Sequence, residues 1–489
     1  MRIDLFLTAY YQARIFCCKF AAQNATNIMQ LNDKFIENIN RLLPSGDACA
    51  LLHAIADESP VTAVRLNPNK GFKLPTELSR VPWCEAGVYL SERPQFTFDP
   101  NFHAGSYYVQ DPSSMFIYHV IKSLIKHPVK YLDLCAAPGG KTTAALQALP
   151  QGSEVIANEI MPQRAQVLRE NVIKWGADNC MVTCDNPKSL GAITGNFDVI
   201  ATDVPCSGEG MFRKDDEAVA QWSPALVEQC ASRQREILNA VWPALKPGGL
   251  LIYSTCTYNK HENEEMVDYI INNLGATVVE VPINLEWNIT PAIGRDYACY
   301  HFMPHMTQGE GLFMCVLRKN HCATTNLINE KRKDKKGTKN STLPIPDELK
   351  KWINGNYFVG EANGIVTATP THIKEHFNNQ YKNLHIIKDF GTEMGLIKGK
   401  KIVPSHQLAM SANLATDSIA TVEVDYPTAI SYLRGEAICI EGPKGYVLIR
   451  FKGAVLGWAN NLGTRANNLY PKPWRIMSTY VPNVPPSMS

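Results

Sequence analysis

Two short segments of the sequence each place a cysteine directly after a run of residues typical of a buried β-strand. They are Asp203-Val204-Pro205-Cys206 and Ser254-Thr255-Cys256. A thiolate that adds to carbon 6 of a pyrimidine turns the ring into an enamine, whose carbon 5 can attack an activated methyl group. The reaction also needs an acid near N3 and a base that removes the C5 proton. Cys256, Cys206 and Asp203 are candidates for this catalytic set.

The neighbours of the two cysteines favour exposed loops over a buried core. Ser207 and Gly208 follow Cys206, and Thr257 follows Cys256. Free cysteines are often small buried apolar residues, so a pair of inert buried cysteines is the alternative. The residue types alone do not rank the two thiols, because either one can serve as the nucleophile in this chemistry.

A strand-turn-helix pattern upstream of both cysteines is typical of a cofactor-binding loop. It contains Cys135, Ala136, Ala137, Pro138, Gly139, Gly140 and Lys141, and its glycines let a ligand approach the backbone closely. The loop has neither the GxGxxG pattern of dinucleotide sites nor the spacing of a P-loop. A cofactor with a carboxylate and an adenosine fits better, which points to S-adenosylmethionine. Lys141, at the end of the loop, is placed to orient Asp203 or the base.

Acidic residues follow the next two predicted strands. Glu159 comes just after Val155–Asn158, and Asp185 comes just after 181–184. We expect Glu159 to accept hydrogen bonds from both ribose hydroxyls, as an acid does in dinucleotide folds. We expect Asp185 to meet the adenine amino group. Either carboxylate alone fits a solvated strand end, but two at successive strand ends favour an adenosine site.

The elements that carry these residues alternate between strand and helix from residue 127 onward. Apolar runs predict strands at Tyr131–Cys135, Val155–Asn158, Met181–Thr183, Phe197–Asp203 and Gly249–Ser254. Helical spacing predicts helices at Thr142–Leu149, Gln163–Trp175 and Pro224–Ala244. Thr277–Val281 and Leu312–Arg318 have the look of a hairpin. This order predicts an α/β fold with a Rossmann-like, mostly parallel sheet, whose ligands bind beyond the carboxyl ends of the strands.

The chain before this domain is expected to be helical, and the chain after it rich in strands. Helices are predicted at Asp33–Leu43, Gly46–Ala56 and Pro112–Ile125, with short strands and turns between the last two. Residues 1–29 are either an extension or the product of a start codon assigned too early, with Met29 as the true beginning. We divide the rest into an N-terminal helical, RNA-binding region (30–126), the catalytic domain (127–319), a basic linker (320–343), a small intermediate domain (344–425) and a β-rich module (426–489).

Composition narrows the class of protein. The chain has 489 residues, 45% of them hydrophobic and 19% charged, as in an ordinary soluble enzyme. A formal net charge of +2 means that any basic surface is local, and no apolar run reaches the length of a membrane span. The fourteen cysteines have no CxxC pair and no framework spacing, so we expect neither a zinc site nor disulfides, and a reducing, cytoplasmic compartment. Nothing in the pattern predicts an obligate dimer, so we expect a monomer.

The C-terminal segment 442–489 combines basic and aromatic residues. The segment contains six basic residues and no acidic residue, and five aromatic residues are interleaved with the basic ones. The alternating segments Gly445–Phe451 and Gly453–Trp458 predict a compact β module. Basic residues among aromatics suit a phosphate backbone and unstacked bases, and an ordinary β core with a basic rim is the alternative.

Within the catalytic domain, Arg213 and Lys214 are candidates for further phosphate contacts, and a solvated charged turn is the alternative. We expect His305 to shape the pocket.

Five segments of the chain resemble the Sun-type (Fmu-type) RNA cytosine-C5 methyltransferases. They are Tyr107–Ser114, Asp133–Lys141, Asp203–Gly210, Tyr253–Asn259, and Phe302–His305 together with Gly309–Lys319. The resemblance implies that S-adenosylmethionine is held by Cys135–Lys141, Glu159, Asp185 and Asp203. It also implies that Cys256 is the nucleophile that adds to C6, and that Cys206 assists release of the methylated RNA.

The C-terminal half is similar to one branch of this family. Gly445–Leu448 and Arg465–Pro471 resemble the tail of the bacterial F-type 16S ribosomal RNA methyltransferases, which is a PUA-like RNA-binding module. The expected partner is therefore ribosomal RNA or the small ribosomal subunit. Transfer RNA as the substrate is one alternative, and a ribosome-assembly factor that binds RNA without catalysis is another. The intact pair of cysteines with Asp203 argues against the second alternative.

Overall fold

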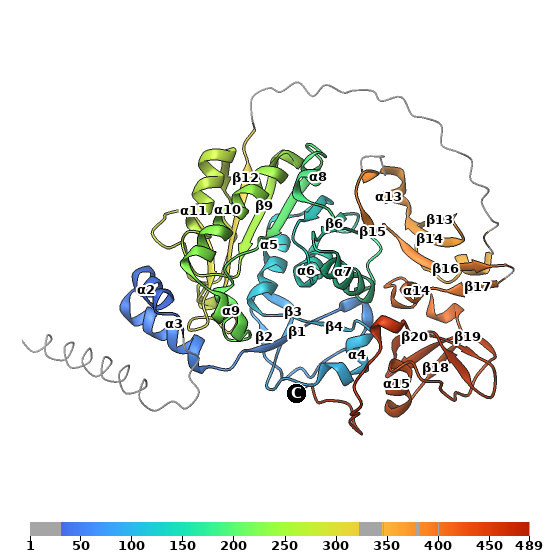
Figure 1. The fold of residues 1–489 in the computed structure, drawn as a ribbon. Helices are drawn as coiled ribbons and strands as arrows, with labels where there is room; N and C mark the ends of the chain where they lie inside the picture. Colours follow the sequence, from blue (N-terminus) through green and yellow to red (C-terminus); the bar gives the residue numbers. More distant parts are fainter. Residues whose placement is uncertain (1–30, 322–344, 346, 377–380, 400, 489) are drawn as a thin grey trace, which may run out of the picture.

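The computed structural model describes residues 31–321, 345, 347–376, 381–399 and 401–488 (Figure 1). The extension predicted at 1–29 and residues 322–343 of the predicted linker lie outside the described residues. Within the described ranges, four sheets organise the chain, one of nine strands and three of four strands. No helix of the described part is both long enough and apolar enough to cross a membrane.

The N-terminal region begins with two helices, α2 (Asp33–Leu42) and α3 (Ser45–Asp57), which confirm two predicted helices. A four-stranded sheet follows, in the order β2-β3-β1-β4: Arg80–Val81, Cys84–Leu90, Thr62–Leu66 and Tyr107–Val109. The sequence predicted short strands and turns in this stretch but not their pairing into one sheet, because prolines separate the strands. The short helix α4 (Pro100–His103) precedes β4, and α5 (Phe116–Leu124) leads into the catalytic domain.

The nine-stranded sheet is the centre of the molecule, and its order is β10-β12-β9-β8-β5-β6-β7-β15, with β11 paired to β12. Its five central strands are parallel: β9 (Leu245–Thr255), β8 (Phe197–Asp203), β5 (Lys130–Asp133), β6 (Glu154–Asn158) and β7 (Cys180–Thr183). This confirms the predicted Rossmann-like sheet.

Both edges of this sheet are antiparallel. Three strands complete one edge: β12 (Leu312–Lys319), β10 (Ala276–Val278) and β11 (Tyr300–Phe302). β10 and β12 pair as the hairpin interpretation expected, but β11 lies between them in the chain, so they are not joined by a turn. The other edge is β15 (Ile386–Lys388), which comes from the C-terminal half and pairs with β7.

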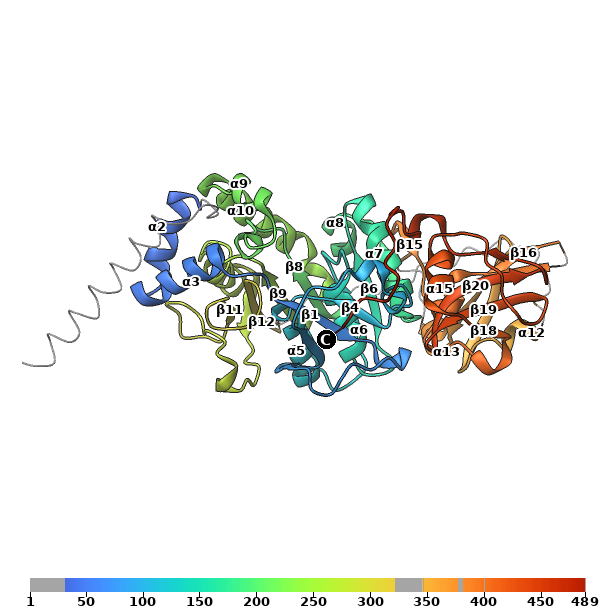
Figure 2. The ribbon, with the colours of Figure 1, turned by 90° about the horizontal axis from the view of Figure 1, so that it is seen from below.

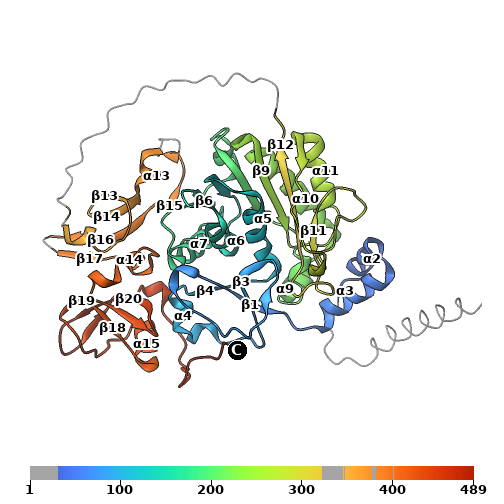
Figure 3. The same ribbon diagram turned by 180° about the vertical axis from the view of Figure 1, so that it is seen from behind.

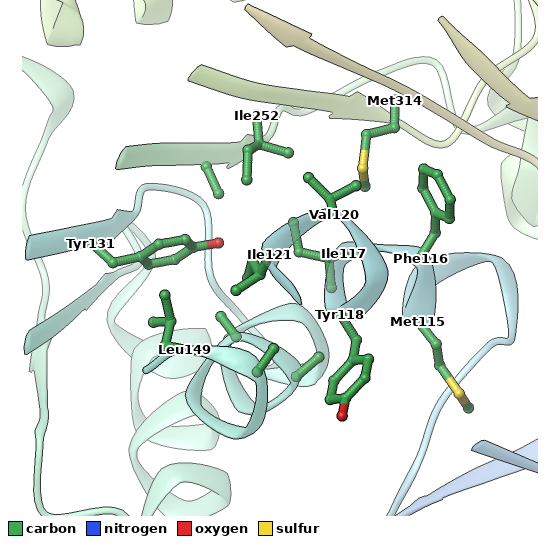
Figure 4. Packing of buried hydrophobic residues seen from close by; sticks show 14 of the residues in the cluster. Met115, Phe116, Ile117, Tyr118, Val120, Ile121, Tyr131, Leu149, Ile252 and Met314 are labelled. Carbon is green, nitrogen blue, oxygen red and sulfur yellow. The ribbon is translucent and has the colours of Figure 1, made fainter. Parts of the chain in front are cut away.

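Helices cover both faces of the sheet (Figures 1 and 2). On one face lie α5, α6 (Gly140–Ala148) and α7 (Pro162–Trp175), and on the other lie α8 (Pro187–Gly191), α10 (Pro224–Val241) and α11 (Glu264–Tyr269). Because side chains of a strand alternate between faces, Tyr131 joins the first core and Leu132 the second. Figure 4 shows α5 side chains packed toward Tyr131 and Ile252. These two cores fix the strand ends that carry the site.

The C-terminal half holds two further sheets, beside α7 (Figure 3). The first has the order β13-β14-β16-β17: Tyr357–Ala362, Ile365–Pro370, Thr392–Lys398 and Lys401–Pro404. The second has the order β18-β19-β20-β21: Thr421–Glu423, Gly445–Phe451, Ala454–Asn461 and Ala466–Asn468. β19 and β20 confirm the two predicted strands. The helices of this half are α12 (Asp347–Lys350), α13 (Thr371–His376), α14 (His406–Met410) and α15 (Tyr426–Leu433).

Candidate active site

The candidate site lies at the carboxyl ends of the five parallel strands. The loop Cys135–Lys141 follows β5, Glu159 follows β6, and Asp185 lies two residues beyond β7. Asp203 is the last residue of β8, and Cys256 directly follows β9. The sheet therefore brings the predicted site residues to one edge, because parallel strands end on the same side.

The two candidate cysteines are in direct contact. Their Sγ atoms are 3.0 Å apart, and the backbone N–H of Cys256 donates to Cys206 Sγ at 3.3 Å. β8 and β9 are neighbours, with Asp203 opposite Ser254, so the loops that follow them meet. The hydrogen bond to Cys256, together with burial, raises the pKa of the Cys206 thiol well above its usual range. Cys206 is therefore a neutral thiol near neutral pH.

Asp203 is held by two donors beside the cysteines. Lys141 Nζ donates to Asp203 Oδ2 at 2.7 Å, and Ser254 Oγ donates to Oδ1 at 2.9 Å. Burial lowers the pKa of Lys141, but the negative charge of Asp203 outweighs this and the pKa is raised. Interaction with Cys256 raises it as well, so the ammonium lies within electrostatic reach of that sulfur. The predicted contact between Lys141 and Asp203 is confirmed.

A buried polar network fixes the two cysteine loops relative to each other. Glu262 accepts hydrogen bonds from Ser207 N at 3.0 Å, Gln234 Nε2 at 2.8 Å and Asn259 Nδ2 at 2.9 Å. Burial raises the pKa of Glu262. Since Ser207 follows Cys206 and Asn259 belongs to the Cys256 loop, one carboxylate joins both loops to α10.

A second buried carboxylate closes the same network. Glu209 Oε2 accepts from the backbone N–H of Tyr258 at 2.7 Å, and Oε1 accepts from Trp222 Nε1 at 3.0 Å. Gly210 N also donates to Cys256 O at 2.9 Å. The sequence interpretation missed Glu209, Glu262 and Asn259 as functional residues. Glu209 and Asn259 lie within the segments Asp203–Gly210 and Tyr253–Asn259 that carry the family resemblance, whereas the only signal for Glu262 was its position six residues after Cys256.

The loop after β5 is anchored to α7, and it leads directly into α6. Arg164 Nη2 donates to Ala137 O at 3.0 Å, and Asn171 Nδ2 donates to Pro138 O at 2.8 Å. Gly139 precedes α6 with a φ of 112°, a conformation that favours glycine. The first turn of α6 thus presents backbone N–H groups beside the loop, and such a helix N-terminus favours a negatively charged ligand group.

Burial raises the pKa of two groups at the start of this loop, Asp133 and Cys135. Burial raises the pKa of Asp133 to about 7, although the side chain accepts from Thr142 Oγ1 at 2.7 Å. Burial also raises the pKa of Cys135 to about 12, so Cys135 is a thiol and packs as a wall of the loop. The Cys135 thiol therefore does not compete with Cys256 as a nucleophile.

Glu159 and Asp185 lie further along the same edge. Glu159 is 3% exposed, and its Oε1 accepts from Met161 N at 3.0 Å. Asp185 Oδ2 accepts from His385 N at 2.8 Å, just before β15, so the C-terminal half helps to shape this end of the site. Asn158 ties the ends of three strands together, because it bonds Leu134 O, Thr183 Oγ1 and Asp185 N.

A cavity of about 190 Å³ opens between the loop and the N-terminal region. Its lining comes from Tyr108–Asp111, Ser114, Cys135–Pro138, Gly140, Lys141 and Asp203. The donors of the α6 first turn suit a carboxylate, and Glu159, which lies at the next strand end outside the lining of this cavity, suits ribose hydroxyls. The residues present therefore fit a cofactor with an amino-acid end and an adenosine, such as S-adenosylmethionine.

The structure gives other positions to the remaining candidates. Arg213 is buried, and its Nε donates to Glu310 Oε2 at 2.8 Å, so it is neither a phosphate contact nor part of a solvated turn. Lys214 Nζ lies 3.4 Å from Glu310 Oε1. Burial lowers the pKa of His305, which interacts with Asp47 and Glu58 of the N-terminal helical region. No group of three or more His, Cys, Asp or Glu in the described part is arranged to hold a metal ion.

Comparison with known proteins identifies the family. The model of the N-terminal domain of the 16S rRNA methyltransferase RsmF matches residues 31–112, that of the 16S rRNA methyltransferase RsmB/F matches 125–318, and that of the RsmF PUA domain matches 420–476. The chain belongs to the RsmB/F family of methyltransferases. It is therefore an S-adenosylmethionine-dependent methyltransferase with a PUA domain at its C-terminal end.

Individual relatives of this RsmB/F-family chain match either nearly all of it or about half of it. The ribosomal RNA small subunit methyltransferase F of Aliivibrio fischeri (strain MJ11) is 27% identical over 476 residues, which cover 90% of this chain and 97% of that protein. The corresponding protein of Serratia proteamaculans (strain 568) is 33% identical over 251 residues, which cover 50% of this chain and 52% of that protein.

Solved structures support the same fold. A methyltransferase homolog protein from Pyrococcus horikoshii superposes with a TM-score of 0.50 at 25% identity, covering 60% of this chain and 96% of that one. NSun6 from Pyrococcus horikoshii, solved with SFG, superposes with a TM-score of 0.51 at 21% identity, covering 60% of this chain and 99% of that one. The second likeness shows the fold alone.

Proposed function

We propose that this RsmB/F-family chain methylates carbon 5 of a cytosine in 16S ribosomal RNA through a covalent bond between Cys256 and carbon 6. The observation that carries the proposal is the contact between two thiols, 3.0 Å apart, beside the Lys141–Asp203 pair. Methylation of an oxygen or an exocyclic nitrogen needs no thiol. Two adjacent thiols suit a reaction that makes a carbon–sulfur bond and then breaks it.

The assignment of the nucleophile follows the charges of the site. Cys206 is held as a neutral thiol by burial and by its contact with Cys256. Lys141 lies within electrostatic reach of Cys256. We assign Cys256 as the sulfur that forms the bond to C6, as the family resemblance implies.

We propose that the Lys141–Asp203 pair lends a proton to N3 of the cytosine and takes it back at the end of the reaction. As the Cys256 sulfur bonds to C6, electron density moves to N3, which takes up a proton from this pair. S-adenosylmethionine supplies the methyl group that C5 then receives. In the release step a water molecule takes the proton from C5, and the electrons of that C–H bond restore the double bond between C5 and C6. The Cys256 sulfur leaves C6 as a thiolate, and N3 returns its proton to the pair. We assign Cys206 to this step because its sulfur lies against that of Cys256.

The target cytosine has to leave any base stack to reach Cys256. Extrusion of a base costs a few kcal/mol, and least where the base is already unpaired. The PUA domain, matched over 420–476, is the part that we expect to dock folded RNA. Relatives that span nearly the whole chain are named small-subunit ribosomal RNA methyltransferases, which favours 16S rRNA over transfer RNA.

The substrate is tested by direct mapping of the product. The full-length chain is incubated with S-adenosylmethionine and, separately, with 16S rRNA transcript, assembled small subunits and total transfer RNA. Mass spectrometry of nuclease digests then locates any new methyl group. We expect one 5-methylcytosine in 16S rRNA or in the subunit. Methylation of transfer RNA alone would redirect the substrate, and a methyl group on another atom would refute the chemistry.

A further inference from the structure

Gln110 holds a buried amide nitrogen without an acceptor. The residue directly follows β4 in the N-terminal region and is 6% exposed. Its Oε1 accepts from Arg65 Nε at 2.8 Å, and within the described ranges its Nε2 has no hydrogen-bond partner. Because Arg65 can only donate, the oxygen has to face it and the NH₂ group has to face away. A buried donor left unpaired is costly, so this one is expected to gain an acceptor when a ligand binds.

The free amide nitrogen lies at the N-terminus of α6. A Cβ built on Gly140 would come within 3.5 Å of Gln110 Nε2, and both residues line the 190 Å³ cavity beside the cofactor loop. α6 is nine residues long, and the first N–H groups of a helix have no partner within the helix. Gln110 Nε2 and the α6 N-terminus therefore offer donors to the same small space.

Arg65 adds a positive charge behind these donors. It is fully buried, and its guanidinium donates to neutral oxygens only, those of Gln110, Gly140, Thr143 and Gln147. It also lies 4.4 Å from the centre of the Trp175 ring. No carboxylate of the described residues forms an ion pair with it. A buried cation without a counter-ion favours an anion nearby.

We propose that Gln110 binds the carboxylate of the S-adenosylmethionine amino-acid end, with Arg65 as the positioning residue that orients the amide and supplies positive potential. The proposal rests on the cofactor dependence in the proposed function. It makes the N-terminal region, matched by a separate family model, part of the cofactor site. An acceptor on the cytosine is the less favourable occupant, since a neutral carbonyl gains less from Arg65 than an anion does.

The proposal is tested by binding measurements that need no RNA. Isothermal titration calorimetry gives the Kd of S-adenosylhomocysteine for the full-length wild type, Gln110→Ala and Gln110→Glu. Loss of a hydrogen bond to a charged group weakens binding by about tenfold or more, and Gln110→Glu is expected to weaken it further because two carboxylates then face each other. The matched control is Gln151→Ala, an exposed glutamine that follows α6 and is expected to leave the Kd unchanged.

A second ligand separates a carboxylate contact from a general disturbance of the loop. Methylthioadenosine carries the adenosine but no carboxylate, so its Kd is expected to stay the same in Gln110→Ala. Equal weakening of both ligands, or no weakening of S-adenosylhomocysteine, would overturn the proposal. Unchanged binding of S-adenosylhomocysteine with a loss of RNA adduct would place the acceptor on the cytosine, which also overturns it. Failure of the RNA chemistry alone leaves these Kd values as they are, so the two proposals fail separately.

Discussion

Replacement of Glu262 tests whether the buried network positions the two cysteines. In Glu262→Ala, the backbone N–H of Ser207 loses both of its acceptor oxygens, at 3.0 and 3.3 Å. Gln234 Nε2 keeps Pro205 O, and Asn259 Nδ2 keeps Thr257 Oγ1, so these two donors are weakened rather than orphaned. One orphaned N–H costs about 1–3 kcal/mol, and the cavity and the two weakened bonds bring the expected loss of unfolding free energy to about 3 kcal/mol.

Urea unfolding followed by tryptophan fluorescence measures this loss. The rate of covalent adduct formation with RNA is expected to fall as well, while the Kd of S-adenosylhomocysteine stays unchanged, because the network supports the cysteine loops and not the loop after β5. Glu265→Ala is the control, since Glu265 is exposed and pairs only with His261 among the described residues. A Glu262→Ala protein with wild-type stability and wild-type adduct formation would refute the role of the network.

Two further predictions follow from the buried charges. The folded-state pKa of Asp133, about 7, lies above its unfolded value of 3.8, so its contribution to stability is present below pH 3.8 and is lost as the pH rises through 7. The free energy of unfolding of Asp133→Asn, measured in urea relative to that of the wild type, should therefore increase by about 4 kcal/mol between pH 4 and pH 8. If the two proteins show parallel pH profiles of stability, this prediction is contradicted. Arg213→Met leaves the buried Glu310 carboxylate with Lys214 as its remaining cationic partner, and it should lower the free energy of unfolding by about 3 kcal/mol or more. Arg41→Ala removes an exposed pair with Glu37 and should lower the free energy of unfolding by under about 1 kcal/mol. Equal losses in these two variants would show that the Arg213 pair is not desolvated.

The strand ends of the catalytic domain could be predicted from the sequence. Apolar runs of three to seven residues separated by helical patterns predict a parallel sheet, and such a sheet brings the residues that follow each strand to one edge. This is why Asp203 and Cys256, more than fifty residues apart, were expected to meet. The contact between Lys141 and Asp203 followed from the same geometry.

The support around the site could not be predicted in the same way. Glu262 lies in the polar run Lys260-His261-Glu262-Asn263-Glu264-Glu265, which has the composition of a solvated turn. Its burial depends on donors that α10 and the Cys206 loop bring from far away in the chain. Arg65 likewise occupies a polar position of a short strand, and only the packing of β1 against α6 shows that its charge is buried. β15 is three residues long, and no local pattern indicates its pairing with β7.

The most direct test of the proposed chemistry is to trap the bond between the protein and its RNA. Wild type, Cys206→Ala and Cys256→Ala are incubated with S-adenosylmethionine and 16S rRNA, and RNA-linked protein is separated under denaturing conditions. If Cys256 bonds to C6 and Cys206 assists release, Cys206→Ala accumulates the linked species and Cys256→Ala forms none. Accumulation in Cys256→Ala instead would contradict the assignment of the two thiols, and the absence of any linked species in all three proteins would contradict covalent catalysis on this RNA.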